Sequence, residues 1–241
     1  MNRILGVSVL LLCSGAAVVA QTAALPTIDQ VLDKYIAGSG GRAALEKVTS
    51  FRAQGTIAVT EAGVSGTIEL QQKAPDKAAT TVEIAGTRQR EVFDGSTAWS
   101  EDANGVREKS GAELAESKRS ATFGRELKMK TIYKTLTVSA RGKVGSRDAI
   151  VVDAVPADGS PTKLFFDAES GVLLQQVGTR LTQQGPLEVE VTYEDYRAVD
   201  GVQRPFTIRQ ATSMFTAIIQ ITDIKHNVPI DDAVFKKPGI F

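Results

Sequence analysis

Hydrophobic and polar side chains alternate along much of this chain from Phe51 onward, and this alternation constrains the fold more than any other feature. A period of two places apolar side chains on one face of a strand and polar side chains on the other. In the first such segment the apolar face consists of Phe51, Ala53, Gly55, Ile57 and Val59. The pattern predicts strands over residues 51–60, 64–73 and 187–194, the first two joined into a hairpin by a turn at Ala62–Gly63.

Short turn signals that contain glycine recur along the chain, mostly at intervals of roughly 9–15 residues. They are Ala85–Gly86, Asp94–Gly95, Asn104–Gly105, Asp158–Gly159, Ser170–Gly171, Gln184–Gly185 and Asp200–Gly201. Parallel strands need a crossover of about a dozen residues at each step, and most of these intervals have no room for one. We therefore expect an antiparallel meander of about nine to eleven strands, and a twisted sheet of that width curls rather than staying flat.

Two short helices are predicted ahead of the first strand. Thr27 and Gln30 have the spacing of a capping box at the start of the first helix. An apolar stripe at helical spacing follows, formed by Ile28, Val31, Leu32, Tyr35 and Ile36. The glycines of Gly38–Gly41 are expected to end this helix, and the second helix is expected over residues 42–48.

A longer helical segment is predicted to interrupt the strands at residues 110–130. Ser110 and Glu113 have the spacing of a second capping box, and Gly124 is expected to break the segment into two helical pieces. The predicted fold class is therefore mainly β with helices (α+β). It is a curled antiparallel sheet, or incomplete β-barrel, in which residues 110–129 form a helical lid over the concave side.

The start of the chain has the three parts of a cleavable signal peptide. Arg3 supplies the positive charge, and the apolar run Ile4–Leu12 follows it. The small residues Val18 and Ala20 stand at the −3 and −1 positions of a cleavage site before Gln21. These features predict export of the chain.

The same segment has two alternative interpretations. A membrane anchor would need a stop-transfer pattern after the apolar run, and the sequence has none there. A lipoprotein signal would use Cys13, but Leu12 is not the small residue that such a signal places before its cysteine. We expect residues 1–20 to be a signal peptide and residues 21–241 to form one domain.

Residue counts exclude several classes of function. Lys plus Arg and Asp plus Glu both number 28 in the 241 residues, so the chain lacks the basic surplus that binding to nucleic acid needs. Without residues 1–20 it has no cysteine and one histidine, which excludes a zinc site of the Cys/His kind. That histidine, His226, is interpreted as a solvated loop residue rather than the base of a catalytic triad. We expect no catalytic residue, no metal and no cofactor.

Large apolar side chains outside the clearest strand patterns are candidates for the wall of a ligand cavity. They are Trp99, Phe123, Leu127, Met129, Met214 and Phe215. Methionine suits such a wall because its flexible side chain adapts to different ligands. The alternative is that these residues pack in an ordinary core, as most large aromatic side chains do.

Several segments together resemble the outer-membrane lipoprotein-sorting, or LolA-like, family. They are Tyr35–Leu45, the hairpin Phe93–Gly95 with Trp99, the stretch Phe166–Leu173 and, above all, Tyr193–Phe206. The resemblance spans nearly all of residues 21–241 and implies a single half-barrel domain, an incomplete antiparallel barrel with a helical lid over an apolar cavity.

The resemblance also implies a function. It indicates a soluble periplasmic protein, expected to be a monomer, that is not an enzyme and that carries or binds lipid acyl chains or lipidated proteins (lipoproteins). Such a carrier must shield about 0.8 kcal/mol of hydrophobic free energy for each methylene group. The alternative is an interaction module of the cell envelope that has the same fold, binds a protein partner and takes no lipid ligand.

Overall fold

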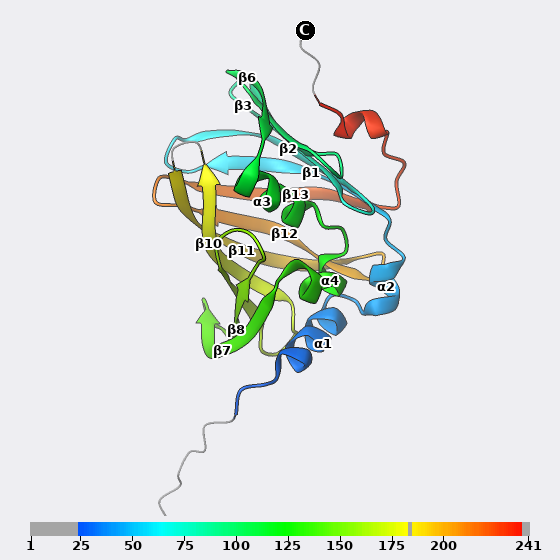
Figure 1. Cartoon of the computed structure of the whole chain (residues 1–241), viewed down its shortest axis with the longest axis vertical. Helices are drawn as coiled ribbons and strands as arrows, with labels where there is room; N and C mark the ends of the chain where they lie inside the picture. The colour runs from blue at the N-terminus through cyan, green and yellow to red at the C-terminus, as the bar shows by residue number, and fades with distance from the viewer. Residues whose placement is uncertain (1–23, 183–184, 238–241) are drawn as a thin grey trace, which may run out of the picture.

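The computed structural model describes residues 24–182 and 185–237, and within these ranges thirteen strands form one antiparallel sheet (Figure 1). The strands are β1 Ser50–Val59, β2 Val64–Lys73, β3 Lys77–Ile84, β4 Thr87–Phe93, β5 Ala98–Asp102, β6 Gly105–Lys109, β7 Thr135–Val144, β8 Arg147–Val155, β9 Thr162–Asp167, β10 Leu173–Thr182, β11 Gly185–Val199, β12 Val202–Ala211 and β13 Thr216–His226. The predicted fold class is confirmed.

The order of the strands shows how the sheet is built. It runs β6-β5-β4-β3-β2-β1-β13-β12-β11-β10-β9-β8-β7. Strands β1–β6 form one meander, β7–β13 form a second, and the two join where β1 pairs with β13. The sheet curls like the wall of a barrel. The barrel is incomplete because the edge strands β6 and β7 do not pair with each other in the part of the chain described here.

This topology explains why helices cover the sheet. β6 and β7 are consecutive in sequence but lie at opposite edges of the sheet, so the chain between them must cross from one edge to the other. The crossing segment contains α3 (Gly111–Ala121) and α4 (Arg125–Ile132), which lie over the concave face (Figure 1). We call residues 110–132 the lid. Gly124, in the left-handed conformation at φ 66°, separates its two helices as predicted.

The first two helices are α1 (Ile28–Gly38) and α2 (Arg42–Glu46), the second slightly shorter than expected. Both bonds of the predicted capping box form at the start of α1. The Gln30 backbone N–H donates to Thr27 Oγ1, and the Thr27 N–H donates to the Gln30 side chain. The capping box predicted at Ser110 was wrong. Ser110 makes no side-chain cap, because Glu113 is held instead by two hydrogen bonds from Arg107 of β6, at 2.6 and 3.0 Å.

The expected strand number of nine to eleven was too low because three connections carry weak turn signals. They lie at residues 74–76, 145–146 and 212–215. The expected signal peptide, residues 1–20, lies outside the described residues. Among the helices of residues 24–182 and 185–237, none has the length and apolar character needed to cross a membrane.

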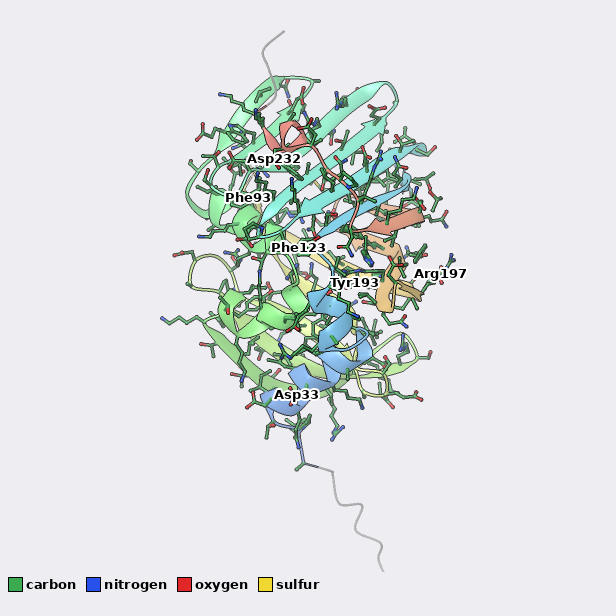
Figure 2. The ribbon with its side chains drawn as sticks, turned by 90° about the vertical axis from the view of Figure 1, so that its right-hand side faces the viewer. Asp33, Phe93, Phe123, Tyr193, Arg197 and Asp232 are labelled. Carbon is green, nitrogen blue, oxygen red and sulfur yellow. The ribbon has the colours of Figure 1, made fainter. Side chains whose placement is uncertain are left out.

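The core is divided between the two faces of the sheet. On the concave face α1 and α4 pack on β8 and β9, around Leu32, Met129 and Phe166, and α3 packs on β4 and β5. On the opposite face the short 3-10 helix η1 (Asp232–Phe235) covers β3–β5. Figure 2 shows η1, marked by Asp232, and α1, marked by Asp33, at opposite ends of the molecule.

Candidate functional site

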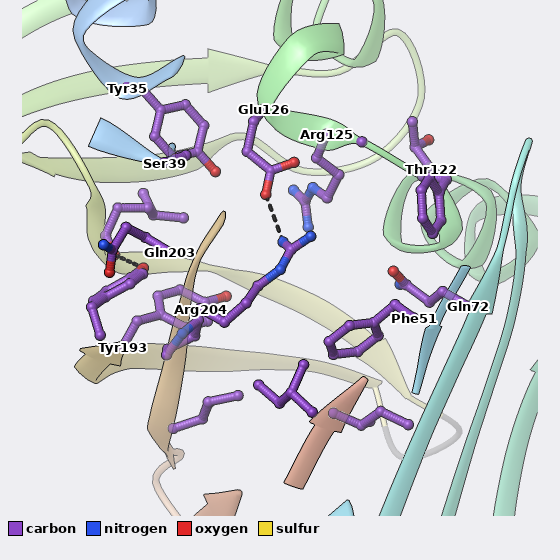
Figure 3. Close-up of a pocket in the computed structure, with 18 of the residues that line it drawn as sticks. Tyr35, Ser39, Phe51, Gln72, Thr122, Arg125, Glu126, Tyr193, Gln203 and Arg204 are labelled. Atoms are coloured by element: carbon purple, nitrogen blue, oxygen red, sulfur yellow. Dashed lines mark hydrogen bonds and ion pairs between the residues drawn. The ribbon is translucent and has the colours of Figure 1, made fainter. Parts of the chain in front are cut away.

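A pocket of about 220 Å³ lies between the lid and the concave face of the sheet (Figure 3). Its walls come from both meanders, from α1 and from the start of α4, so segments far apart in the sequence meet there. The lining residues are Tyr35, Ser39, Phe51, Leu70, Gln72, Thr122, Phe123, Gly124, Arg125, Glu126, Met129, Leu164, Leu173, Tyr193, Tyr196, Gln203, Arg204, Pro205, Ile208, Ile221 and Ile224.

The floor of the pocket is apolar. Strand alternation on β12 and β13 directs Ile208 and Ile221 to this face, and Leu70 of β2 lies beside them. At the other end Leu164 and Leu173 extend the apolar surface onto β9 and β10. The floor therefore runs across the junction of the two meanders.

Three tyrosines give the pocket its neutral polar groups. Burial raises the pKa of Tyr35, Tyr193 and Tyr196 above the ordinary value, so their hydroxyls stay protonated at neutral pH. The Tyr196 hydroxyl donates to the backbone carbonyl of Leu173 at 2.6 Å. These phenols are hydrogen-bond donors and not bases.

An ion pair connects the lid to the sheet inside the pocket. Arg204 Nη1 of β12 donates to Glu126 Oε1 of α4 at 2.9 Å, drawn dashed in Figure 3. The side chains are 20% and 12% exposed, respectively, so water screens this pair less than it screens a surface pair. The Arg204 guanidinium also lies 5.5 Å from the centre of the Phe51 ring. The lid is thus held by a charged contact above an apolar floor.

His226 supports this ion pair, and its prediction as a solvated loop residue was wrong. It ends β13, and its side chain is fully buried. Its Nε2 accepts from Arg204 Nε at 3.3 Å, and its Nδ1 lies 3.4 Å from Asp200 Oδ2. Burial, together with the nearby Arg204 charge, lowers the pKa of His226 below its usual range. The neutral ring is therefore the form that the fold accommodates.

A second arginine, Arg125, lines the pocket without an acidic partner. It begins α4, directly after Gly124, and its side chain makes no hydrogen bond or ion pair with any other residue in the described ranges, while the Glu126 carboxylate acts on its charge through space. Figure 3 shows Arg125, Glu126 and Arg204 projecting into the same space. The polar side of the pocket thus carries two cations and one anion.

The described residues bring together no group of three His, Cys, Asp or Glu side chains suited to a metal ion. His226, the single histidine, faces Arg204 and Asp200, and no serine hydroxyl in the described ranges donates to it. The pocket therefore presents binding surface and no nucleophile paired with a base.

Two of the six residues predicted to line a ligand cavity do line the pocket, and four do not. Phe123 and Met129 line the pocket. Leu127 lies behind them, packed against the cluster that includes Leu45 and Val48.

The other three candidates lie outside the pocket. Trp99 packs under η1, on the face of the sheet opposite α3. Met214 is 66% exposed in the connection between β12 and β13, and Phe215 next to it packs on the β1–β13 cluster. Sequence reasoning missed Glu126 and Arg204, because charged residues in a lid helix and a strand look like solvated surface.

Comparison with solved structures places this architecture among known folds, whereas family models and curated proteins give no match to the chain. A LolA superfamily protein from Nitrosomonas europaea superposes with a TM-score of 0.58 at 14% identity, covering 88% of this chain and 98% of that one. This chain has the LolA fold. A DUF1329 family protein from Desulfovibrio piger superposes with a TM-score of 0.59 at 12% identity, over 87% and 97% of the two chains. A protein domain from Vibrio parahaemolyticus named for outer membrane lipoprotein sorting gives 0.58 at 14% identity, over 85% and 97%.

Proposed function

We propose that this protein is a non-enzymatic carrier or binder of lipids or lipidated proteins in the periplasm, and that an acyl chain occupies the pocket under the lid. The observation that carries the proposal is the apolar floor, which extends across both meanders beneath the lid. Burying a methylene group there stabilises the complex by about 0.8 kcal/mol, so a chain of several methylenes supplies enough free energy for specific binding. The lipoprotein-sorting name of the Vibrio parahaemolyticus domain supports this choice of ligand class.

The size of the pocket requires the lid to move. Pockets that bind drug-sized ligands measure about 300–1,000 Å³, whereas this one measures about 220 Å³. The lid is suited to such movement because each of its helices buries a single residue fully, Ala121 in α3 and Met129 in α4. An element with so little buried apolar surface opens at low cost in free energy. We therefore expect the described arrangement to be the closed, unloaded state.

The test is displacement of a fluorescent fatty acid from the purified protein. Ile208→Trp fills the floor and should weaken binding strongly. Ile218→Trp is the matched control, because Ile218 pairs with Arg209 and so lies on the opposite face of the sheet. Melting curves recorded on both variants show whether each is folded.

Two results would refute the proposal: a wild-type protein that takes up no fatty acid, or equal binding by two folded variants. Absence of uptake together with capture of a defined envelope protein would favour the interaction module. If this chain is an interaction module, its own side chains fill the pocket and the Arg204–Glu126 pair closes it.

A further inference from the structure

A second, smaller cavity adjoins the apolar pocket. It measures about 90 Å³ and lies between α3 and strands β9–β11. Arg125 lines both cavities and therefore marks the place where they meet. The second cavity is lined by Glu116, Arg119, Ser120, Arg125, Tyr133, Ser160, Thr162, Gln176, Gly178, Thr179, Arg180, Val189 and Val191.

The chemistry of this cavity differs from that of the first. Three arginines, Arg119, Arg125 and Arg180, contribute positive charge, and hydroxyl and amide side chains surround them. Glu116 is the only acid among the described lining residues, and it pairs with Arg180 Nε at 3.2 Å. The lining therefore carries a net charge of about +2, counting each ionised side chain at its full charge at neutral pH.

Contacts within the protein neutralise only part of this positive charge. Arg180 connects β10 to α3 through Glu116, and Arg119 Nη1 donates to the backbone carbonyl of Asp158. A carbonyl accepts a hydrogen bond but does not neutralise the guanidinium. The Arg125 side chain, half-buried, makes no hydrogen bond or ion pair with the described residues, and the carboxylate that acts on its charge through space, that of Glu126, already pairs with Arg204. One carboxylate shared by two arginines leaves positive charge here, and an anion from outside the chain would neutralise it.

We propose that this cavity binds the anionic phosphate head group of a lipid whose acyl chain occupies the apolar pocket. This inference rests on the proposed function and specifies its ligand class. A planar guanidinium donates two parallel hydrogen bonds to phosphate oxygens, which makes arginine the side chain of choice for such a group. A cavity of about 90 Å³ has the liquid volume of about three water molecules, enough room for a phosphate. Arg125, at the junction, contacts the phosphate where the acyl chain begins.

The experiment compares two lipids that share one acyl chain, 1-oleoyl lysophosphatidic acid and 1-oleoylglycerol, by calorimetry on the full exported protein. The wild type should bind the phosphorylated lipid at least about tenfold more tightly, the effect of one charge-assisted hydrogen bond. Arg119→Gln should reduce this preference and leave binding of oleoylglycerol unchanged, because Arg119 lines the second cavity alone. Arg125→Gln, whose side chain lines both cavities, should weaken binding of lysophosphatidic acid by a larger factor than binding of oleoylglycerol. Arg209→Gln is the matched control, because Arg209 is exposed and follows Ile208 on β12, so it points to the opposite face.

Each outcome discriminates. Equal binding of the two lipids by the wild type overturns the head-group proposal while leaving the carrier function intact, whereas binding of neither lipid overturns the carrier function itself. If Arg125→Gln weakens both lipids by the same factor, the arginine supports the fold and the proposal fails. Inorganic phosphate is the third arm. Binding of phosphate alone as tight as that of lysophosphatidic acid would indicate a free-anion site and would also overturn the proposal.

Discussion

Replacing Glu126 with glutamine removes the charged contact that the lid makes with the sheet inside the pocket, and it leaves the size of the side chain almost unchanged. Glutamine has nearly the same shape, and its amide oxygen can still accept a hydrogen bond from Arg204. The substitution therefore changes a charge-assisted hydrogen bond of 2.9 Å into a neutral one, in a place where both partners are mostly shielded from water. The neighbouring arginine, Arg125, adds to the effect because Glu126 is the one anion among the described residues that line the pocket.

The size of the effect follows from these contacts. A hydrogen bond to a charged group contributes about 1.5–3 kcal/mol, and a neutral one contributes about 1 kcal/mol. The variant should thus weaken closure of the lid by about 0.5–2 kcal/mol. If the lid opens together with the rest of the fold, Tm falls by about 1–8 °C for a protein of this length. If the lid opens separately, Tm changes little and the lid amides exchange about 2–30 times faster.

Hydrogen exchange followed by mass spectrometry on peptides covering residues 111–132, run beside a melting curve, distinguishes these two cases. Glu46→Gln is the matched control, since Glu46 pairs with Arg42 on the exposed surface of α2 and such a pair contributes little. Unchanged exchange and unchanged Tm in Glu126→Gln, relative to this control, would refute the view that the ion pair holds the lid closed.

Three further predictions test the fold and its export. The pKa of His226 is lower in the folded protein than in the unfolded chain, so as the pH falls the unfolded chain is protonated first. Stability should therefore decrease as the pH falls below about 6.5, and this loss should be absent in His226→Gln. Urea unfolding of both proteins at pH 7.5 and 5.5 measures the difference. Gly38→Ala should destabilise by more than about 2 kcal/mol, because the new methyl would lie 2.0 Å from the Ser170 carbonyl oxygen. The same change at Gly63, an open turn residue in the left-handed conformation at φ 61°, should cost about 1–2 kcal/mol in thermal unfolding. N-terminal sequencing of the protein recovered from the cell envelope fraction should start at Gln21, and a chain that retains its first residues would contradict cleavage.

The sequence predicted the fold well where local signals are strong. Alternation over β1, β2 and β11 fixed which face is apolar, and glycine turn signals located most of the connections. It undercounted the strands where a turn lacks such a signal, as at residues 212–215 between β12 and β13. Local pattern also indicated a broken helical lid, although its position over the sheet follows from the strand order.

The site was harder to predict, since it depends on which segments meet in space. Trp99 and Phe123 look alike in sequence, but Trp99 lies on the face under η1 and Phe123 lies in the pocket. Arg204 and His226 are separated by a whole hairpin and come together only because β12 pairs with β13. A lone histidine among polar neighbours gives no local sign of burial. The prediction that His226 is solvated therefore failed, because its burial depends on which strands pair in space.

The most direct test of lipid carriage is mass spectrometry of the lipids extracted from the protein after it is purified from its native host without added detergent. Phosphorylated, acyl-containing lipids should co-purify in near-stoichiometric amount with the wild type and with Ile218→Trp, and should be lost from folded Ile208→Trp. A lipid-free extract from wild-type protein, or the same lipids on both variants, would contradict lipid carriage.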